Sequence, residues 1–98
     1  MRKTVAEIAD QVLREAGREI IGWEDDNLFD EITRRATHTN LKRLSAEERK
    51  KRIFFYIEVS GMFVAGKVTE YRGNRSYETR LFRRISRPVI EAQTFPGL

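Results

Sequence analysis

The sequence predicts an α+β fold in which three helices are followed by a two-stranded antiparallel hairpin. The first half places apolar residues at helical spacing behind residues that cap helices, and the second half places β-branched, aromatic and basic residues around a Gly73-Asn74 turn. The charge changes with the pattern. Residues 1–49 hold nine Lys/Arg and eleven Asp/Glu, whereas residues 50–98 hold ten Lys/Arg and four Glu. The basic second half favours a polyanionic partner.

The chain has 98 residues, of which 40% are hydrophobic, and no cysteine. This length and apolar content predict one domain with a single core, which we expect to span residues 1–87 and to be followed by a tail at 88–98. In that tail, Val89, Ile90 and Phe95 are candidates for docking on the body. The lack of cysteine excludes disulfides and thiolate metal sites.

The first helix is expected over residues 5–16. Thr4 and Glu7 have the spacing of a capping box, and Gly17 is suited to the left-handed conformation that ends a helix. One face is apolar at helical spacing; it comprises Val5, Ile8, Ala9, Val12, Leu13 and Ala16.

The segment 18–23 is too short and too β-branched for another helix, and is expected to be an extended connector that sends Ile20 or Ile21 into the core. Trp23 is compatible with a core position or with an interface. The second helix is expected to begin at the caps offered by residues 25–27 and to stop in the polar segment 37–40.

The third helix begins at a second capping-box pattern, formed by Ser45 and Glu48. The run 53–59 has the β-branched and aromatic composition of a strand. However, nothing breaks the helix before Ser60-Gly61, so we expect helix to about residue 59. Four aromatic residues around its end are expected in the core, or else as a patch for a protein partner: Phe54, Phe55, Tyr56 and Phe63.

The hairpin is expected from residues 62–71 and 77–85, joined by a turn at 72–76. Gly66 suggests a bulge or a break in the first strand. The predicted order is helix, extended piece, helix, helix and hairpin. This is the order of a winged helix, here with a two-stranded antiparallel wing.

Four segments in this order resemble the HARE-type helix-turn-helix domains and the amino-terminal domain of the bacterial RNA polymerase delta subunit. They are the opening helix Ile8–Gly17, the segment Leu28–Ile32, and Leu44–Ile53 followed by Ser60–Val64. The resemblance covers roughly residues 4–66. It implies a winged-helix-like fold and a non-enzymatic role in transcription, with DNA or RNA polymerase as the partner.

The chain departs from the delta subunit in two respects. It has no long acidic tail after the domain, and residues 62–85 make a longer and more basic hairpin. Both differences favour direct contact with nucleic acid.

The first candidate nucleic-acid contact is the run Arg49, Lys50, Lys51 and Arg52 in the third helix. Since a buried unpaired charge is costly, at least two of the four must be exposed. The third helix of a winged helix is the one usually presented to the major groove. The alternative is a solvated helix face that Glu47 and Glu48 partly neutralise.

The second candidate is the hairpin. Its basic residues could reach phosphates or a minor groove from the tip, or could protect an edge strand from aggregation. The residues proposed as contacts are Lys67, Arg72, Arg75 and Arg80, with Arg83, Arg84 and Arg87 nearby.

No group of residues predicts catalysis, a metal site or a cofactor. His38 is the only histidine, and Asp25, Asp26, Asp30 and Glu31 lack the spacing of an EF-hand loop. No signal sequence or membrane-spanning run is present, which predicts a cytoplasmic protein without a membrane partner or a small-molecule substrate. The leading hypothesis is duplex DNA binding, and the alternative is a module that docks on RNA polymerase.

Overall fold

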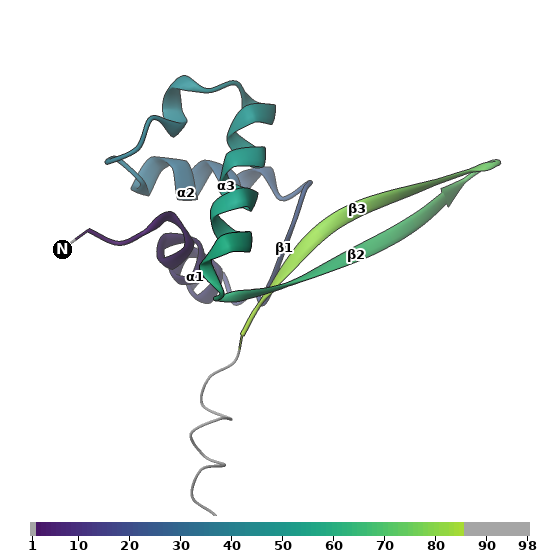
Figure 1. Ribbon diagram of the computed structural model, residues 1–98, viewed down its shortest axis with the longest axis horizontal. Helices are drawn as coiled ribbons and strands as arrows, with labels where there is room; N and C mark the ends of the chain where they lie inside the picture. The colour runs from purple at the N-terminus through teal and green to yellow at the C-terminus, as the bar shows by residue number, and fades with distance from the viewer. Residues whose placement is uncertain (1, 86–98) are drawn as a thin grey trace, which may run out of the picture.

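A computed structural model describes residues 2–85 as three helices and a three-stranded antiparallel sheet (Figure 1). The expected tail at 88–98 and Arg87 lie outside the described residues. The elements in chain order are α1 (Val5–Glu15), β1 (Ile20–Gly22), α2 (Asp26–Arg35), the 3-10 turn η1 (Leu41–Arg43), α3 (Ala46–Ser60), β2 (Phe63–Arg72) and β3 (Arg75–Arg84).

The first helix is confirmed to within one residue. The Thr4 hydroxyl accepts a hydrogen bond from the Glu7 N–H at 3.1 Å, and the Glu7 carboxylate accepts the Thr4 N–H at 2.8 Å. This reciprocal pair is the predicted capping box, which satisfies donors that the helix itself leaves free. Gly17 follows the helix with a φ of +70°.

The expected two-stranded wing is wrong in one respect, because the sheet has three strands in the order β1-β3-β2. The connector contributes β1, in which Ile20, Ile21 and Gly22 pair with Arg83, Phe82 and Leu81. Ile21 is fully buried, as expected for one of the two isoleucines. A three-residue strand carries little sequence signal of its own, and its partner lies about 60 residues away in the chain.

The second helix starts at Asp26 and ends before Ala36, close to its expected limits. Asp25 does not cap it with its side chain. Instead its carboxylate accepts the Gly22 N–H at 2.7 Å and an Arg18 N–H at 3.1 Å, which holds the turn after β1. The polar segment that ends the helix leads into η1, an element that the sequence did not predict, whose Leu41 is buried.

The third helix continues through the ambiguous run, as expected. The Ser45 hydroxyl accepts the Glu48 N–H at 3.2 Å, which is one half of the predicted capping box. Gly61 ends the helix with a φ of +76°. Helix wins over strand here because Ile53 and Ile57, one turn apart, are both fully buried against the core.

The hairpin is confirmed, but the turn expected at 72–76 is wrong in extent, because Arg72 and Arg75 pair as strand residues and leave only Gly73 and Asn74 between them. Gly73 takes a φ of +62° at the first position of this two-residue turn, as a tight turn of the II′ type requires. The bulge or break suggested at Gly66 is wrong, since Gly66 pairs in register with Leu81. A Cβ at this position would lie 3.1 Å from the Leu81 Cδ1. Glycine therefore makes room for the side chain of its cross-strand neighbour.

A cluster of aromatic rings joins the helices to the sheet. Phe54 of α3 lies 4.9 Å from Phe82 of β3 and 5.4 Å from Phe29 of α2, measured between ring centroids. Trp23 packs edge-on against Phe54 at 5.8 Å, so it covers the core rather than standing free. The base of the hairpin is thus fixed to the body, while the remainder extends beyond it.

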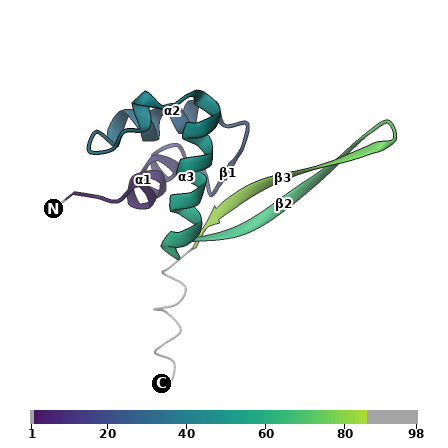
Figure 2. The same cartoon turned by 45° about the horizontal axis from the view of Figure 1, so that its top comes forward.

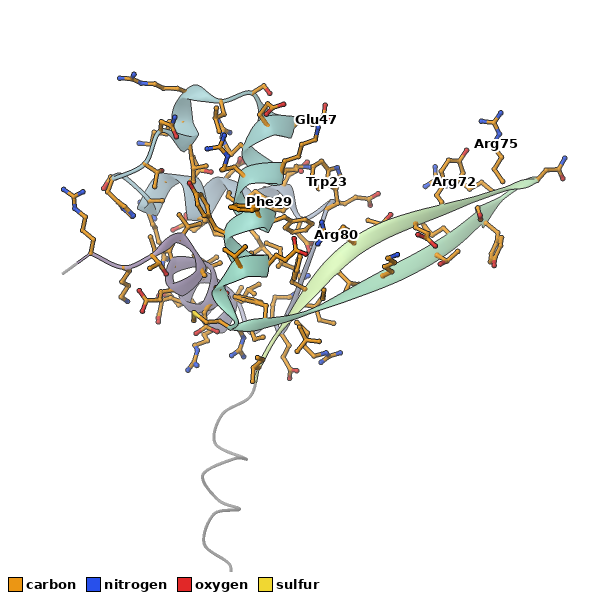
Figure 3. All side chains as sticks on the ribbon, in the orientation of Figure 1. Trp23, Phe29, Glu47, Arg72, Arg75 and Arg80 are labelled. Carbon is orange, nitrogen blue, oxygen red and sulfur yellow. The ribbon has the colours of Figure 1, made fainter. Side chains whose placement is uncertain are left out.

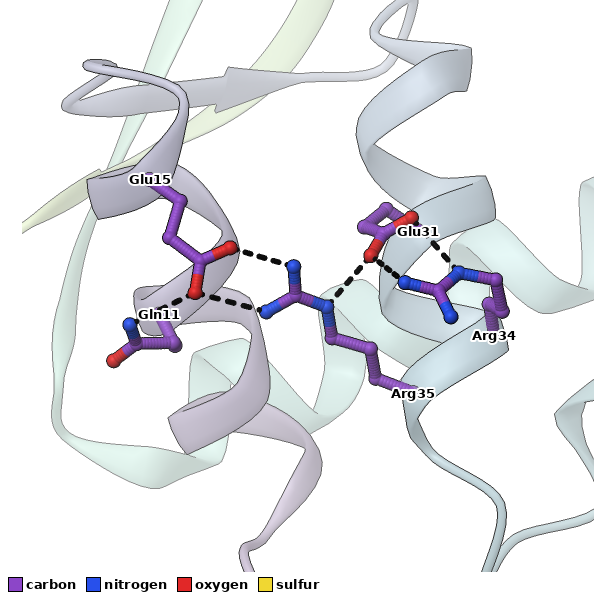
Figure 4. A network of polar contacts seen from close by, with 5 residues as sticks. All are labelled: Gln11, Glu15, Glu31, Arg34 and Arg35. Atoms are coloured by element: carbon purple, nitrogen blue, oxygen red, sulfur yellow. Dashed lines mark hydrogen bonds and ion pairs between the residues drawn. The ribbon is translucent and has the colours of Figure 1, made fainter.

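A network of carboxylates and guanidinium groups joins α1 to α2 (Figure 4). Arg35 donates to Glu15 at 2.6 Å and to Glu31 at 2.6 Å, and Gln11 and Arg34 add further hydrogen bonds. Hydrogen bonds from Arg35 and then Gln11 lower the pKa of Glu15 to about 2. Hydrogen bonds from Arg34 and then Arg35 lower the pKa of Glu31 to about 2.

Acid should weaken the α1–α2 contact. Both carboxyl groups bind protons more weakly in the folded chain, so their contribution is complete above a pH of about 4.5 and is lost as the pH falls towards about 2. Urea unfolding of the wild type at pH 2–6 should show this loss. An Arg35→Gln variant should show a weaker dependence on pH in that window, and an equal dependence would contradict the assignment.

No helix in residues 2–85 is long and apolar enough to cross a membrane.

Candidate nucleic-acid interface

The hairpin carries the net charge of the protein. Residues 63–84 contain six Lys/Arg and two Glu, a net charge of +4, whereas residues 2–62 contain twelve Lys/Arg and twelve Asp/Glu. In both ribbon views the hairpin extends away from the three helices (Figures 1 and 2). Arg83 and Arg84 lie at the base of the hairpin, where they pair with Glu19 and Asp10 of the body. The projecting part, residues 67–80, holds four Lys/Arg and two Glu, so its net charge is +2 and all four cations are exposed.

The tip of the hairpin combines cations with exposed aromatic rings. Arg72 and Arg75 are direct cross-strand partners on either side of the turn, and both side chains lie on the same side of the ribbon (Figure 3). The Arg72 guanidinium stands 5.6 Å from the centre of the Tyr77 ring. Tyr71 is 80% exposed. Guanidinium groups beside exposed rings are suited to phosphates and to bases.

The middle of the hairpin is basic but better neutralised. Lys67 and Arg80 are also cross-strand partners. The Lys67 ammonium lies 3.5 Å from the Glu78 carboxylate, and the Arg80 guanidinium lies 3.1 Å from Glu58 of α3. The four side chains are between 47% and 65% exposed, so these pairs are weak and a polyanion can compete for the cations.

Two of the four predicted cations of α3 make internal contacts. Arg49 donates hydrogen bonds to the carbonyl oxygens of Leu41 and Leu44, both at 3.1 Å, and a longer one to Lys42. Lys50 donates to the carbonyl oxygen of Trp23 at 2.9 Å and pairs with Asp26. Its ammonium also lies 5.1 Å from the centre of the Trp23 ring.

Arg49 and Arg52 form a matched pair for testing this difference. Arg49→Ala should lower the free energy of unfolding by about 1–3 kcal/mol, because it leaves carbonyl groups of the η1 segment without their charged donor. Arg52→Ala should change it by less than about 0.5 kcal/mol, since Arg52 is exposed and has no ion pair within residues 2–85. Urea unfolding measures both, and equal losses would contradict the structural role of Arg49.

The outward face of α3 is not uniformly basic. Lys51 and Arg52 are exposed, and Lys51 lies 3.5 Å from Glu47. The same face also presents Glu48, Glu58, Phe55 and Val59. In the part of the chain that the structure describes, α3 therefore offers two exposed cations, one of them paired with Glu47. The hairpin offers four beyond its base, Lys67, Arg72, Arg75 and Arg80, of which Arg75 has no ion pair within residues 2–85.

A groove of about 480 Å³ separates α3 from the hairpin. It is lined by Trp23, Lys51, Phe54, Phe55, Glu58, Glu78, Thr79 and Arg80. Phe55 is 55% exposed and does not join the core, unlike Phe54 and Phe63. The sequence left open whether these aromatic residues lie in the core or in an exposed patch. Phe54 and Phe55 differ because consecutive residues of a helix point in different directions.

The described residues contain no group of three or more His, Cys, Asp or Glu side chains that could hold a metal ion. His38 is exposed at the end of a shallow pocket beside Arg2 and Lys3. The strongest concentration of binding chemistry in residues 2–85 is therefore the basic hairpin. Comparison with protein-family models, with curated proteins and with solved structures gave no match.

Proposed function

We propose that the protein is a non-enzymatic, transcription-associated winged-helix protein that binds nucleic acid through its hairpin. The observation that carries this proposal is the location of four exposed cations, Lys67, Arg72, Arg75 and Arg80, on a β-ribbon that projects from the helices (Figure 1). The winged-helix assignment is supported by the order of elements, with β1 between the first two helices and the hairpin after the third.

The ribbon is suited to a duplex by size and chemistry. A two-stranded β-ribbon fits the major groove of B-DNA, and cations along it neutralise backbone phosphates. Arg72 and Arg75 would make the contacts at the tip, and Lys67 and Arg80 would follow along the ribbon. Lys51 and Arg52 would approach the backbone from α3. Arg49 and Lys50 act within the fold and hold the start of α3 in place.

The experiment is a titration of a labelled 20-base-pair mixed-sequence duplex with the full chain at several KCl concentrations. Binding should weaken steeply with salt, because contacts with phosphates release condensed counterions. A chain that does not bind the duplex at low salt, or whose affinity is independent of salt, would reject nucleic-acid binding by this surface.

The alternative function is a docking module for RNA polymerase, which the resemblance to the delta subunit implies. The observation that favours it is the outward face of α3, where Phe55, which lines the groove, and Val59, one turn further on, are 55% and 63% exposed. A salt-tolerant complex with polymerase in a pull-down, lost in Phe55→Ala, together with no retention of free DNA, would favour this alternative.

A further inference from the structure

Arg72 and Arg75 violate a rule of strand pairing. Their Cα atoms are direct cross-strand partners that close the Gly73-Asn74 turn, and such partners have Cβ atoms about 4.5–5.5 Å apart on one face of the ribbon. Like charges at this position destabilise a hairpin. Local violations of this kind are expected at functional sites, where a bound ligand can supply the opposite charge that the chain itself does not provide.

The surrounding chain offsets the repulsion at the tip only weakly, through one long and exposed ion pair. The carboxylate paired with Arg72 is that of Glu70, at 3.8 Å, and Arg75 has no ion pair with any carboxylate in residues 2–85. The second like-charge pair of the ribbon, Lys67 with Arg80, differs in this respect. It has Glu78 at 3.5 Å and Glu58 at 3.1 Å.

We infer that Arg72 and Arg75 form a clamp for one backbone phosphate of the nucleic acid, an inference that rests on the proposed function. Guanidinium groups donate paired N–H groups whose geometry matches two phosphate oxygens. The contact of Arg72 with the Tyr77 ring restricts the guanidinium. Its ion pair with Glu70 is long and exposed, so a phosphate can compete for its N–H groups. A phosphate between the two cations replaces their repulsion by two charge-assisted contacts.

Binding of a phosphate between Arg72 and Arg75 should stabilise the pairing of the two strands at the tip. Because the phosphate binds the paired form of the strands, nucleic acid should protect the tip from opening. An opposite charge built into the chain should have the same effect and should compete with the ligand. Arg75→Glu makes that change, and Lys67→Glu is the matched control because it alters the net charge equally on the same ribbon.

The test measures amide hydrogen exchange and duplex binding for the wild type and both variants, with the labelled 20-base-pair duplex as the probe. Arg75→Glu should slow exchange at residues 70–77 without DNA and should weaken duplex binding by about tenfold or more. Lys67→Glu should weaken duplex binding several times less. Duplex should slow exchange at the tip of the wild type and not at that of Arg75→Glu.

The outcomes separate this inference from the proposed function. A wild-type chain that does not bind the duplex rejects both. Duplex binding that Arg75→Glu and Lys67→Glu weaken equally rejects the clamp and leaves electrostatic binding by the hairpin intact. Faster exchange at the tip of Arg75→Glu also rejects the clamp. It would show that replacing Arg75 by an acidic residue does not stabilise the tip, and hence that Arg72 and Arg75 do not repel each other in the wild type.

Discussion

Replacing Arg72 and Arg75 by alanine should reduce both the affinity for duplex DNA and the steepness of its dependence on salt. Each lost phosphate contact lowers the slope of log affinity against log salt concentration by about 1, so the double variant should lose about 2. The affinity at low salt should fall by about tenfold or more. Fluorescence anisotropy with a labelled duplex at several KCl concentrations measures both quantities.

The control for this experiment is the double variant Arg14→Ala and Arg34→Ala, which changes the net charge by the same amount on α1 and α2. Both arginines are exposed, and exposed ion pairs such as Arg14–Asp10 and Arg34–Glu31 contribute little to stability, so this variant should be slightly less stable at neutral pH but still folded. Its salt slope should match that of the wild type. If the two double variants lose the same affinity and slope, the net charge of the protein drives binding and the tip has no special role.

Phe82→Ala should lower the free energy of unfolding by about 3–5 kcal/mol, the range found for large aromatic residues removed from a core. Phe82 is 1% exposed and its ring lies 4.9 Å from that of Phe54. It also pairs with Ile21 of β1, so its removal affects both the core and the centre of the sheet. A domain of this size has about 5–15 kcal/mol of stability in total. Urea unfolding measures the loss.

The matched control is Tyr71→Ala, another aromatic truncation in the same hairpin. Tyr71 is 80% exposed, so the change should be within about 0.5 kcal/mol. A loss below about 1 kcal/mol for Phe82→Ala would contradict the role of this ring as the link between hairpin and helices.

Local signals explain why most helix limits could be predicted. The Thr4 and Glu7 capping box, the Ser45 cap and the glycines that follow α1 and α3 all act within one or two turns of the chain. The Gly73-Asn74 turn is equally local and predicted the hairpin. Such features are readable because the atoms that interact are neighbours in sequence.

The pairing of segments that are distant in the chain was harder to predict from the sequence. The short β1 strand becomes a strand only because β3 returns beside it, and Gly66 stays in register because Leu81 packs over it. Among the candidate contacts, the sequence required that at least two of the four adjacent cations of α3 be exposed, without distinguishing which two. Their different positions around the helix put Arg49 and Lys50 in internal contacts and leave Lys51 and Arg52 exposed.

By itself, the sequence determined an α+β chain with three capped helices, a tight basic hairpin and an excess of positive charge in its second half. Only the tertiary structure decided that β1 completes a three-stranded sheet, that the hairpin projects from the helices (Figure 1), and that Arg72 faces Arg75 across the turn. The physical reason is the distance along the chain between the residues that interact. Caps and turns depend on neighbours a few residues apart, whereas strand register and the pairing of charges depend on which distant segments the core brings together.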